Sequence, residues 1–277
     1  MNDANDVNNA RYLKYRTKFF ISEFFGTALL LLGGLSLVIF MFGAGSPMAE
    51  LIPIVKLRQV ITGFLFGSIG ASIALSPIGK VSGAHINPAV TMVFWIFRKI
   101  ESRLAVTYIL AQLSGAIVGC LPLLFWGQMG RSIEFGVTMP GKGYSMQTAL
   151  LGEVITTFTM VSLLVVFIGF RRIRRFTPFM FPFLYAIMVP LEADISGIST
   201  NPARSIGPAF ISGQWEGWWI YWIGPLAGTL LASLACSFLA KRITIAKLYH
   251  FDGESAGDAL LRRMASSNLT SDPKESR

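Results

Sequence analysis

The stretch Ser82-Gly-Ala-His-Ile-Asn-Pro-Ala-Val-Thr91 returns later in the chain as Ser196-Gly-Ile-Ser-Thr-Asn-Pro-Ala-Arg-Ser205. Asn is a favoured helix N-cap, and Pro fits the first helical position because its missing N–H would have no partner there. Asn-Pro is also a common turn dipeptide, but two copies that each follow Ser-Gly and open an apolar run favour helix starts at Asn87 and Asn201. The run after Asn87 covers about ten residues, roughly 15 Å of helix, or half of a ~30 Å bilayer core. The sequence therefore predicts two half-length helices that enter a membrane from opposite sides and meet at its midplane.

Such a midplane has a definite chemistry. If each Asn oxygen caps its own helix, the amide N–H groups are left free, and two positive helix ends converge in a dry environment. This point donates hydrogen bonds and repels cations. The non-helical backbone before each Asn, residues 83–86 and 197–200, is tolerated at membrane depth only where it is buried or lines a polar cavity. We therefore expect Asn87 and Asn201 to form the midplane of a pore.

The composition is that of a membrane protein. The chain has 277 residues, of which 53% are hydrophobic and 14% are charged, whereas soluble domains carry nearer a quarter charged residues. The net charge of +9 does not indicate nucleic acid, because the basic residues form short clusters between apolar runs. We find no Cys/His metal spacing, no phosphate-binding Gly loop and no nucleophile motif. An enzyme, a catalytic or metal site and a cofactor are therefore not expected.

Six spans are expected, each near the ~20 residues that a bilayer needs. They cover about 17–42, 58–78, 104–126, 148–170, 177–195 and 216–240. The half-helices follow the second and the fifth span. Residues 1–16 are polar and predict a disordered cytoplasmic tail, and residues 241–277 predict a basic cytoplasmic tail. Between the tails lies a channel domain, 17–240, whose halves cover about 17–126 and 148–240.

Lys and Arg set the orientation. With the N-terminus inside, the cytoplasmic segments before the tail hold Arg11, Lys14, Arg16, Lys18, Lys80, Arg98, Lys99, Arg103, Arg171, Arg172, Arg174 and Arg175. The outer segments hold only Lys56, Arg58, Arg131 and Lys142. The positive-inside rule then predicts both termini on the cytoplasmic side of a plasma or bacterial inner membrane.

The two halves repeat. Ser22-Glu23-Phe-Phe-Gly-Thr27 opens the first span and Gly152-Glu153-Val-Ile-Thr-Thr157 opens the fourth, and each leads through two spans to its Asn-Pro-Ala. Since three spans per half is an odd number, the second half must be inverted relative to the first. Inverted repeats are typical of transporters with a site at the midplane.

With these features the sequence resembles the major intrinsic protein family of aquaporins and glycerol facilitators over roughly residues 19–240. The resemblance implies an all-helical fold of six spans and two re-entrant half-helices, one pore per subunit, and a homotetramer. Ser205, Ala209 and Tyr221-Trp222 stand where glycerol facilitators usually carry other residues, so the chain is more similar to the water-channel branch.

The resemblance also assigns roles to single residues. Asn87 and Asn201 match the two pore asparagines. Four residues match the positions that form the outer constriction of the family's pore: Arg204, Phe66, Val189 and Ile198. Typical water-selective members have His in place of Val189 and a small or polar residue in place of Ile198. This pore is therefore expected to be less selective for water.

Four further acidic residues and one histidine complete the expected site. Glu23 and Glu153 match the paired buried glutamates of the family, and we expect them to accept N–H bonds from the re-entrant loops as structural supports. His85 resembles a pore-lining histidine of the first loop. Glu192 and Asp194 are expected on the solvated face of the outer vestibule.

The sequence thus predicts a passive channel for water and for small neutral solutes such as ammonia, urea and hydrogen peroxide, which excludes protons and ions. Three alternatives remain open: a glycerol facilitator, an ion-coupled transporter or ion channel on the same repeat, and a non-conducting scaffold. The expected partners are water, solutes, the lipid bilayer and further copies of the chain, without nucleic acid.

Overall fold

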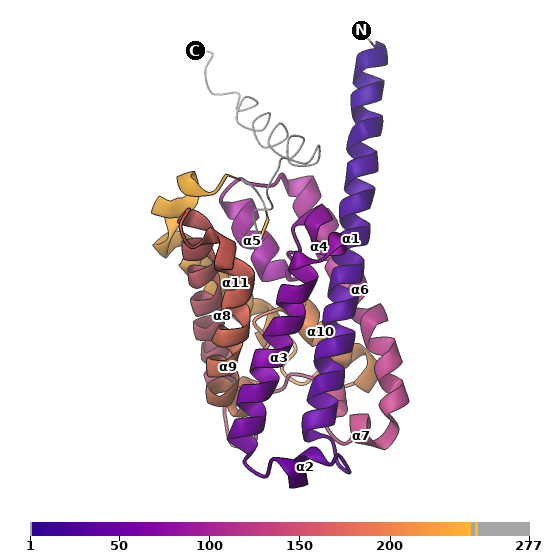
Figure 1. Cartoon of the computed structure of the whole chain (residues 1–277), viewed down its shortest axis with the longest axis vertical. Helices are drawn as coiled ribbons and strands as arrows, with labels where there is room; N and C mark the ends of the chain where they lie inside the picture. Colours follow the sequence, from indigo (N-terminus) through magenta and orange to yellow (C-terminus); the bar gives the residue numbers. More distant parts are fainter. Residues whose placement is uncertain (1, 245–246, 249–277) are drawn as a thin grey trace.

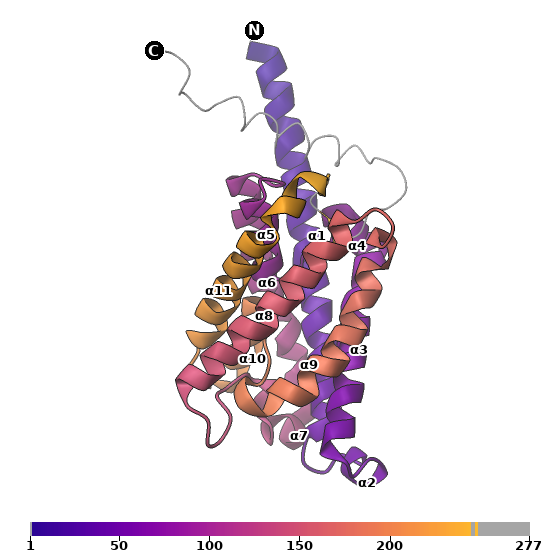
Figure 2. The same ribbon diagram turned by 90° about the vertical axis from the view of Figure 1, so that its left-hand side faces the viewer.

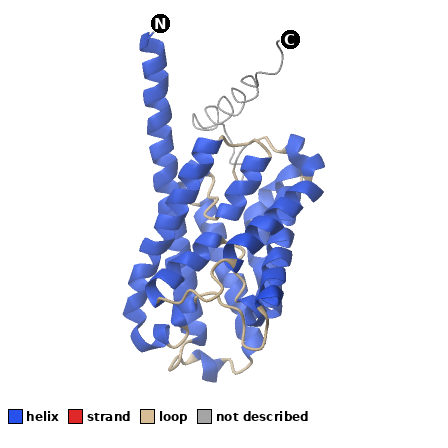
Figure 3. Cartoon of the chain, turned by 180° about the vertical axis from the view of Figure 1, so that it is seen from behind, coloured by secondary structure: helices blue, strands red, loops and turns tan. Residues whose placement is uncertain are grey.

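The computed structural model describes residues 2–244 and 247–248, and the side chains from residue 13 onward within these ranges. This part of the chain consists of helices and loops, with no strand (Figure 3). The six long helices are α1 (Asn2–Phe42), α3 (Val55–Leu75), α6 (Ser102–Cys120), α8 (Met146–Gly169), α9 (Thr177–Ser196) and α11 (Ile220–Ala235). The two half-helices are α5 (Pro88–Ile96) and α10 (Pro202–Ser212). The predicted all-helical membrane fold with half-helices is therefore confirmed.

Short elements join the long ones. The α-helical ones are α2 (Met48–Leu51), α4 (Pro77–Ser82) and α7 (Gly127–Arg131). The 3-10 turns are η1 (Leu121–Trp126), η2 (Glu134–Gly136), η3 (Arg174–Phe176) and η4 (Ser237–Arg242). Figure 1 shows α4 near one end of the bundle and α2 and α7 at the other. We name these the α4 end and the α2 end.

Five helical stretches of the described chain are long and apolar enough to cross a membrane. They are Leu13–Phe42, Val55–Leu75, Ser102–Arg131, Met146–Gly169 and Arg174–Ser196. The sixth expected span, 216–240, contains the shorter helix α11 of 16 residues, which η4 extends after Cys236. It begins later than expected because Gly217 has a φ of +61°, which a helix does not allow.

The N-terminal segment differs from its expectation. Residues 1–16 were expected to form a disordered tail, whereas α1 is helical from Asn2 and continues without a break into the membrane-spanning part. Neither Gly nor Pro occurs among residues 2–16. A helix that is already nucleated by an apolar span propagates through such a stretch at little cost per residue.

The half-helices begin where the sequence predicts. The Asn87 Oδ1 accepts a hydrogen bond of 2.8 Å from the Ala89 N–H, and the Asn201 Oδ1 accepts one of 3.0 Å from the Ala203 N–H. A proline occupies the first helical position of both α5 and α10. Each Asn-Pro-Ala is therefore a capped helix start.

The long helices pack in pairs related between the halves: α1 with α6, α8 with α11, and α3 with α9 across the two halves. Close approach requires glycine at some of these contacts. A Cβ on Gly67 of α3 would lie 2.7 Å from the Pro182 Cα of α9, and one on Gly119 of α6 would lie 2.5 Å from the Ala28 Cα of α1. In Figures 1 and 2, α5 lies in the half of the bundle toward the α4 end, and α10 lies nearer the α2 end. The half-helices therefore approach each other from opposite ends.

Candidate functional site

A cavity of about 310 Å³ lies along the interior of the bundle. One face of α3 lines it with Gln59, Thr62, Gly63, Phe66, Gly67, Gly70, Ala71 and Ala74. These positions recur every three or four residues and extend over about 22 Å at 1.5 Å per residue. Because α3 lines the cavity over this distance, the cavity runs through most of the thickness of a ~30 Å bilayer core.

The two asparagines meet within this cavity. The Asn87 Nδ2 donates to the Thr200 carbonyl at 3.0 Å, and the Asn201 Nδ2 donates to the Ile86 carbonyl at 3.0 Å. The prediction that both N–H groups of each amide are free is wrong, because the opposite loop accepts one of the two. Both asparagines line the cavity. The reciprocal pair ties the halves together and leaves each amide a second N–H.

The loops before the asparagines share one unusual backbone. In the first, φ is +93° at Gly83, +52° at Ala84 and +42° at Ile86. In the second, φ is +80° at Gly197, +43° at Ile198 and +51° at Thr200. Positive φ at a non-glycine residue costs on the order of 1–3 kcal/mol and persists only where the surroundings enforce it. Buried contacts must therefore hold both loops.

Glu23 of α1 holds the first loop. Its two carboxylate oxygens accept N–H bonds from His85 at 2.9 Å and from Ile86 at 2.7 Å. Ser82 donates its hydroxyl to the same carboxylate at 2.5 Å. Glu23 is 0% exposed. A buried carboxylate with such donors is satisfied, and its negative charge lies behind the loop rather than in the cavity.

Glu153 of α8 occupies the equivalent place in the second half. It accepts N–H bonds from Ser199 at 2.7 Å and Thr200 at 2.9 Å, and a hydroxyl bond from Ser196 at 2.8 Å. The structure thus brings both glutamates to the expected loops, with two loop N–H groups and one serine hydroxyl as donors in each half.

Three residues that were not predicted as supports also hold these loops. The Tyr108 hydroxyl donates to the Ser82 carbonyl at 2.8 Å, and the Tyr221 hydroxyl donates to the Ser196 carbonyl at 2.7 Å. Gln112 donates to Glu23 at 2.7 Å. The available signal was a polar group inside an apolar span, since such a group must find a partner.

Arg204 lies toward the α2 end of the cavity and is 8% exposed. Its Nη1 donates to the Gly136 carbonyl at 2.7 Å. Within the described residues, no carboxylate lies within ion-pair distance of Arg204. Its positive charge is therefore not neutralised by a direct partner, and it repels cations that enter.

The other three expected constriction residues, Phe66, Val189 and Ile198, line the same cavity as Arg204. Glycines leave room for two of them: a Cβ on Gly63 would lie 3.0 Å from the Val189 Cγ2. A Cβ on Gly34 of α1 would collide with the Phe66 ring, whose Cζ would lie 2.6 Å away. All four residues therefore border the same cavity, and Phe66, Val189 and Ile198 present apolar side chains to it.

His85 is 1% exposed and borders the cavity. Its ring stacks on Phe94 with centroids 4.6 Å apart and meets Tyr108 edge-on at 4.9 Å. Its Nδ1 lies 3.2 Å from the Thr91 Oγ1. These contacts hold the ring in one orientation, so His85 forms part of a fixed wall.

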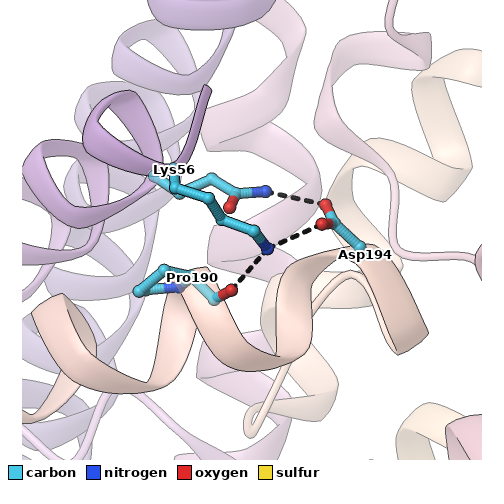
Figure 4. A network of polar contacts seen from close by, with 4 residues as sticks. Lys56, Pro190 and Asp194 are labelled. Atoms are coloured by element: carbon cyan, nitrogen blue, oxygen red, sulfur yellow. Dashed lines mark hydrogen bonds and ion pairs between the residues drawn. The ribbon is translucent and has the colours of Figure 1, made fainter. Parts of the chain in front are cut away.

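A polar cluster surrounds the mouth at the α2 end. Figure 4 shows Lys56 between Pro190 and Asp194; its Nζ lies 2.8 Å from the Asp194 carboxylate and 2.6 Å from the Pro190 carbonyl. The Gln59 Nε2 donates to the same carboxylate at 2.7 Å. The Asp194 side chain is 55% exposed, in agreement with the expected vestibule.

Glu192 does not share this environment. It was expected on the solvated face of the vestibule, but it is 5% exposed, and its Oε1 has no hydrogen-bond partner among the described residues. It packs against Gly152 of α8, where a Cβ would collide with its carboxylate. Two residues along a helix rotate a side chain to nearly the opposite face, which places Glu192 inward and Asp194 at the mouth.

Known proteins match the chain over most of its length. The model of the family described as "Major intrinsic protein" matches residues 11–236. Aquaporin AqpM of Methanothermobacter marburgensis is 36% identical over 243 residues, which cover 81% of this chain and 98% of that protein. Aquaporin-4 of Homo sapiens is 39% identical over 167 residues, 59% of this chain and 52% of that longer protein.

A solved structure shares the fold. The aquaglyceroporin of Plasmodium falciparum superimposes with a TM-score of 0.65 over 82% of this chain and 96% of that one. At 21% sequence identity, this likeness supports the fold and leaves the solute to be argued from the cavity itself.

Proposed function

Because the chain belongs to the major intrinsic protein family, we propose that it is a passive channel for water that also admits small neutral solutes and excludes protons and ions. It is a multi-pass membrane protein of a channel family and is not an enzyme. One observation carries the proposal most directly. Asn87 and Asn201 face each other in the middle of a cavity that follows most of the length of α3.

Water would pass this point in single file. Each asparagine keeps an N–H for a passing water after it has bonded to the opposite loop. The N-termini of α5 and α10 converge here, and each helix N-terminus carries about half a positive charge. Together with Arg204, these ends disfavour a proton or cation in the file, whereas a neutral water oxygen accepts their hydrogen bonds.

The solute range follows from the walls beside Arg204. Val189 and Ile198 are apolar and line the cavity. Their side chains have no polar group that a passing solute could leave without a hydrogen-bond partner. A site rejects a solute strongly when the passage of that solute would leave buried polar groups of the site without partners. We therefore expect ammonia, urea or hydrogen peroxide to pass with water.

Three further features belong to the proposal. Both termini face the cytoplasm, as the distribution of Lys and Arg favours, which makes the α4 end the cytoplasmic one. The channel domain covers 17–240 and is followed by a basic cytoplasmic tail, of which residues 245–246 and 249–277 lie outside the described residues. The functional assembly is a homotetramer with one pore per subunit.

Stopped-flow light scattering on proteoliposomes tests the function. Liposomes that carry the protein should swell or shrink faster than empty ones after an osmotic step, and an internal pH dye should report no added proton leak. The rate should not depend on an imposed proton or sodium gradient, because a coupled transporter would require one. A rate equal to that of empty liposomes, in the native protein and in variants that keep Asn87, Asn201 and Arg204, would refute the water channel.

A further inference from the structure

A short segment near the end of the chain lies against the first re-entrant loop at the α4 end. The Leu248 N–H donates to the Gly83 carbonyl at 3.1 Å. The Lys247 Nζ donates to the Lys80 carbonyl at 3.1 Å. Two residues that are remote in sequence from this loop thus bond to its backbone.

The contact is close enough to require glycine in the loop. A Cβ on Gly83 would lie 2.7 Å from both the Cα and the Cβ of Lys247. Gly83 also has a φ of +93°, which side chains disfavour. The backbone of Lys247 therefore occupies the space that a side chain at position 83 would take, and the segment is seated on the loop rather than near it.

Leu248 reaches the channel itself. Its side chain lines the same cavity as Asn87 and Asn201 and packs into the hydrophobic cluster that includes Ala84 and Ile86. It is only 4% exposed, and Lys247 is 3% exposed. Leu248 therefore borders the cavity at the α4 end, and almost none of its surface is exposed to solvent.

This position opposes the passage of water in two ways. The Leu248 N–H occupies the Gly83 carbonyl, an acceptor at the start of the non-helical stretch. The isobutyl side chain offers water no hydrogen bond, and an apolar constriction excludes a water file by dewetting. The obstruction comes from the chain's own residues, so it needs no external blocker.

We propose that the Lys247–Leu248 segment is a plug whose binding site is the mouth of the channel at the α4 end, so that the protein as folded conducts below its capacity. The proposal rests on the proposed function, because a plug matters only if the cavity conducts. The groups that bind the segment are the carbonyls of Lys80 and Gly83 and the apolar surface around Ala84. Removing the side chain of Leu248 should therefore open the pathway without disturbing Asn87 or Asn201.

Water permeability per reconstituted protein tests the plug with the full-length chain. The variant Leu248→Ser removes the apolar wedge, and Leu234→Ser is the matched control, since Leu234 lies on α11 with 64% of its surface exposed. We expect a severalfold increase for Leu248→Ser and no change for Leu234→Ser. Equal, non-zero permeability of the native protein and Leu248→Ser would overturn the plug and leave the water channel standing.

A labelling experiment reads the position of the segment without any flux. Cys120 and Cys236 are buried, so a membrane-impermeant maleimide should find little background. We expect slow labelling of Leu248→Cys and fast labelling of Lys241→Cys, which stands at an exposed position on η4. Labelling at 248 as fast as at 241 overturns the plug. Absence of water flux in both the native protein and Leu248→Ser overturns the water channel, and the plug with it.

Discussion

Replacing Glu153 by alanine tests the physical account of the re-entrant loops. The side chain is 0% exposed and accepts two backbone N–H bonds, from Ser199 and Thr200, and one hydroxyl bond from Ser196. The hydroxyl can rotate toward another acceptor, but the two N–H groups are fixed by the backbone. An unsatisfied buried donor costs about 1–3 kcal/mol, so the two together predict a loss of about 2–6 kcal/mol in the free energy of unfolding.

Two variants of the same helix calibrate this loss. Glu153→Gln keeps one acceptor oxygen and turns an amide N–H toward the other donor, which predicts about 1–3 kcal/mol for one unsatisfied group. Thr157→Val lies one turn further along α8, is equally buried, and removes a hydroxyl that has no hydrogen-bond partner among the described residues. It should therefore change the stability little.

The assay is thermal unfolding in detergent, followed by water flux of the surviving protein. At roughly 2–4 °C per kcal/mol for a chain of this size, the midpoint of Glu153→Ala should fall by at least about 4 °C. We expect the order of destabilisation to be Ala, then Gln, then Thr157→Val, with water flux lost in the alanine variant as the strained loop relaxes. If Glu153→Ala is as stable and as conductive as Thr157→Val, the carboxylate does not hold the loop.

Further variants test the midplane, the constriction and the mouth. Asn201→Ala removes the cap of α10 and the bond to the Ile86 carbonyl, a loss of about 1 kcal/mol or more; we expect lost expression or lost water permeability, and a folded, active variant would contradict the half-helix interpretation. Val189→His should keep water flux and lower the flux of ammonia, urea or hydrogen peroxide, while Ile198→Gly should admit glycerol. Solute assays that show no change in either variant would remove both residues from the constriction. Asp194→Asn should cost only about 0–1 kcal/mol at low salt and less at high salt, because its pair with Lys56 is half exposed; a larger loss in chemical denaturation would show that the cluster carries more of the fold.

The sequence alone predicted the features that depend on neighbours along the chain. A cap forms between an asparagine side chain and an N–H two residues later. Asn87 and Asn201 therefore predict the starts of α5 and α10 without any tertiary contact. The apolar runs predict the long helices because length and hydropathy are local properties. The repeat in the sequence showed that Glu23 and Glu153 occupy equivalent positions in the two halves. It did not show which groups donate hydrogen bonds to them.

Features that depend on distant partners could be found only in the tertiary structure. The bond from Asn87 to the Thr200 carbonyl joins residues 113 positions apart, so the sequence overstated the number of free amide N–H groups. Gln112 supports Glu23 from another helix; its place inside an apolar span shows that it needs a partner but does not show which one. Glu192 was expected in solvent because its charge favours water, but its position on α9 directs the side chain toward the interior, where it is buried.

The segments near the two ends of the chain also had features that the sequence did not predict. The polar composition of residues 2–16 indicated disorder, whereas the helical path of α1 follows from its continuity with an apolar span. Lys247 and Leu248 carry no motif, and their place at the mouth depends on a carbonyl and a glycine more than 160 positions away. Hydrogen bonds and hydrophobicity within a few residues decide which segments become helices and where the half-helices start, so these features can be predicted from the sequence. Which groups meet in the cavity was decided only by the tertiary structure, because packing alone brings together donors and acceptors that the chain separates.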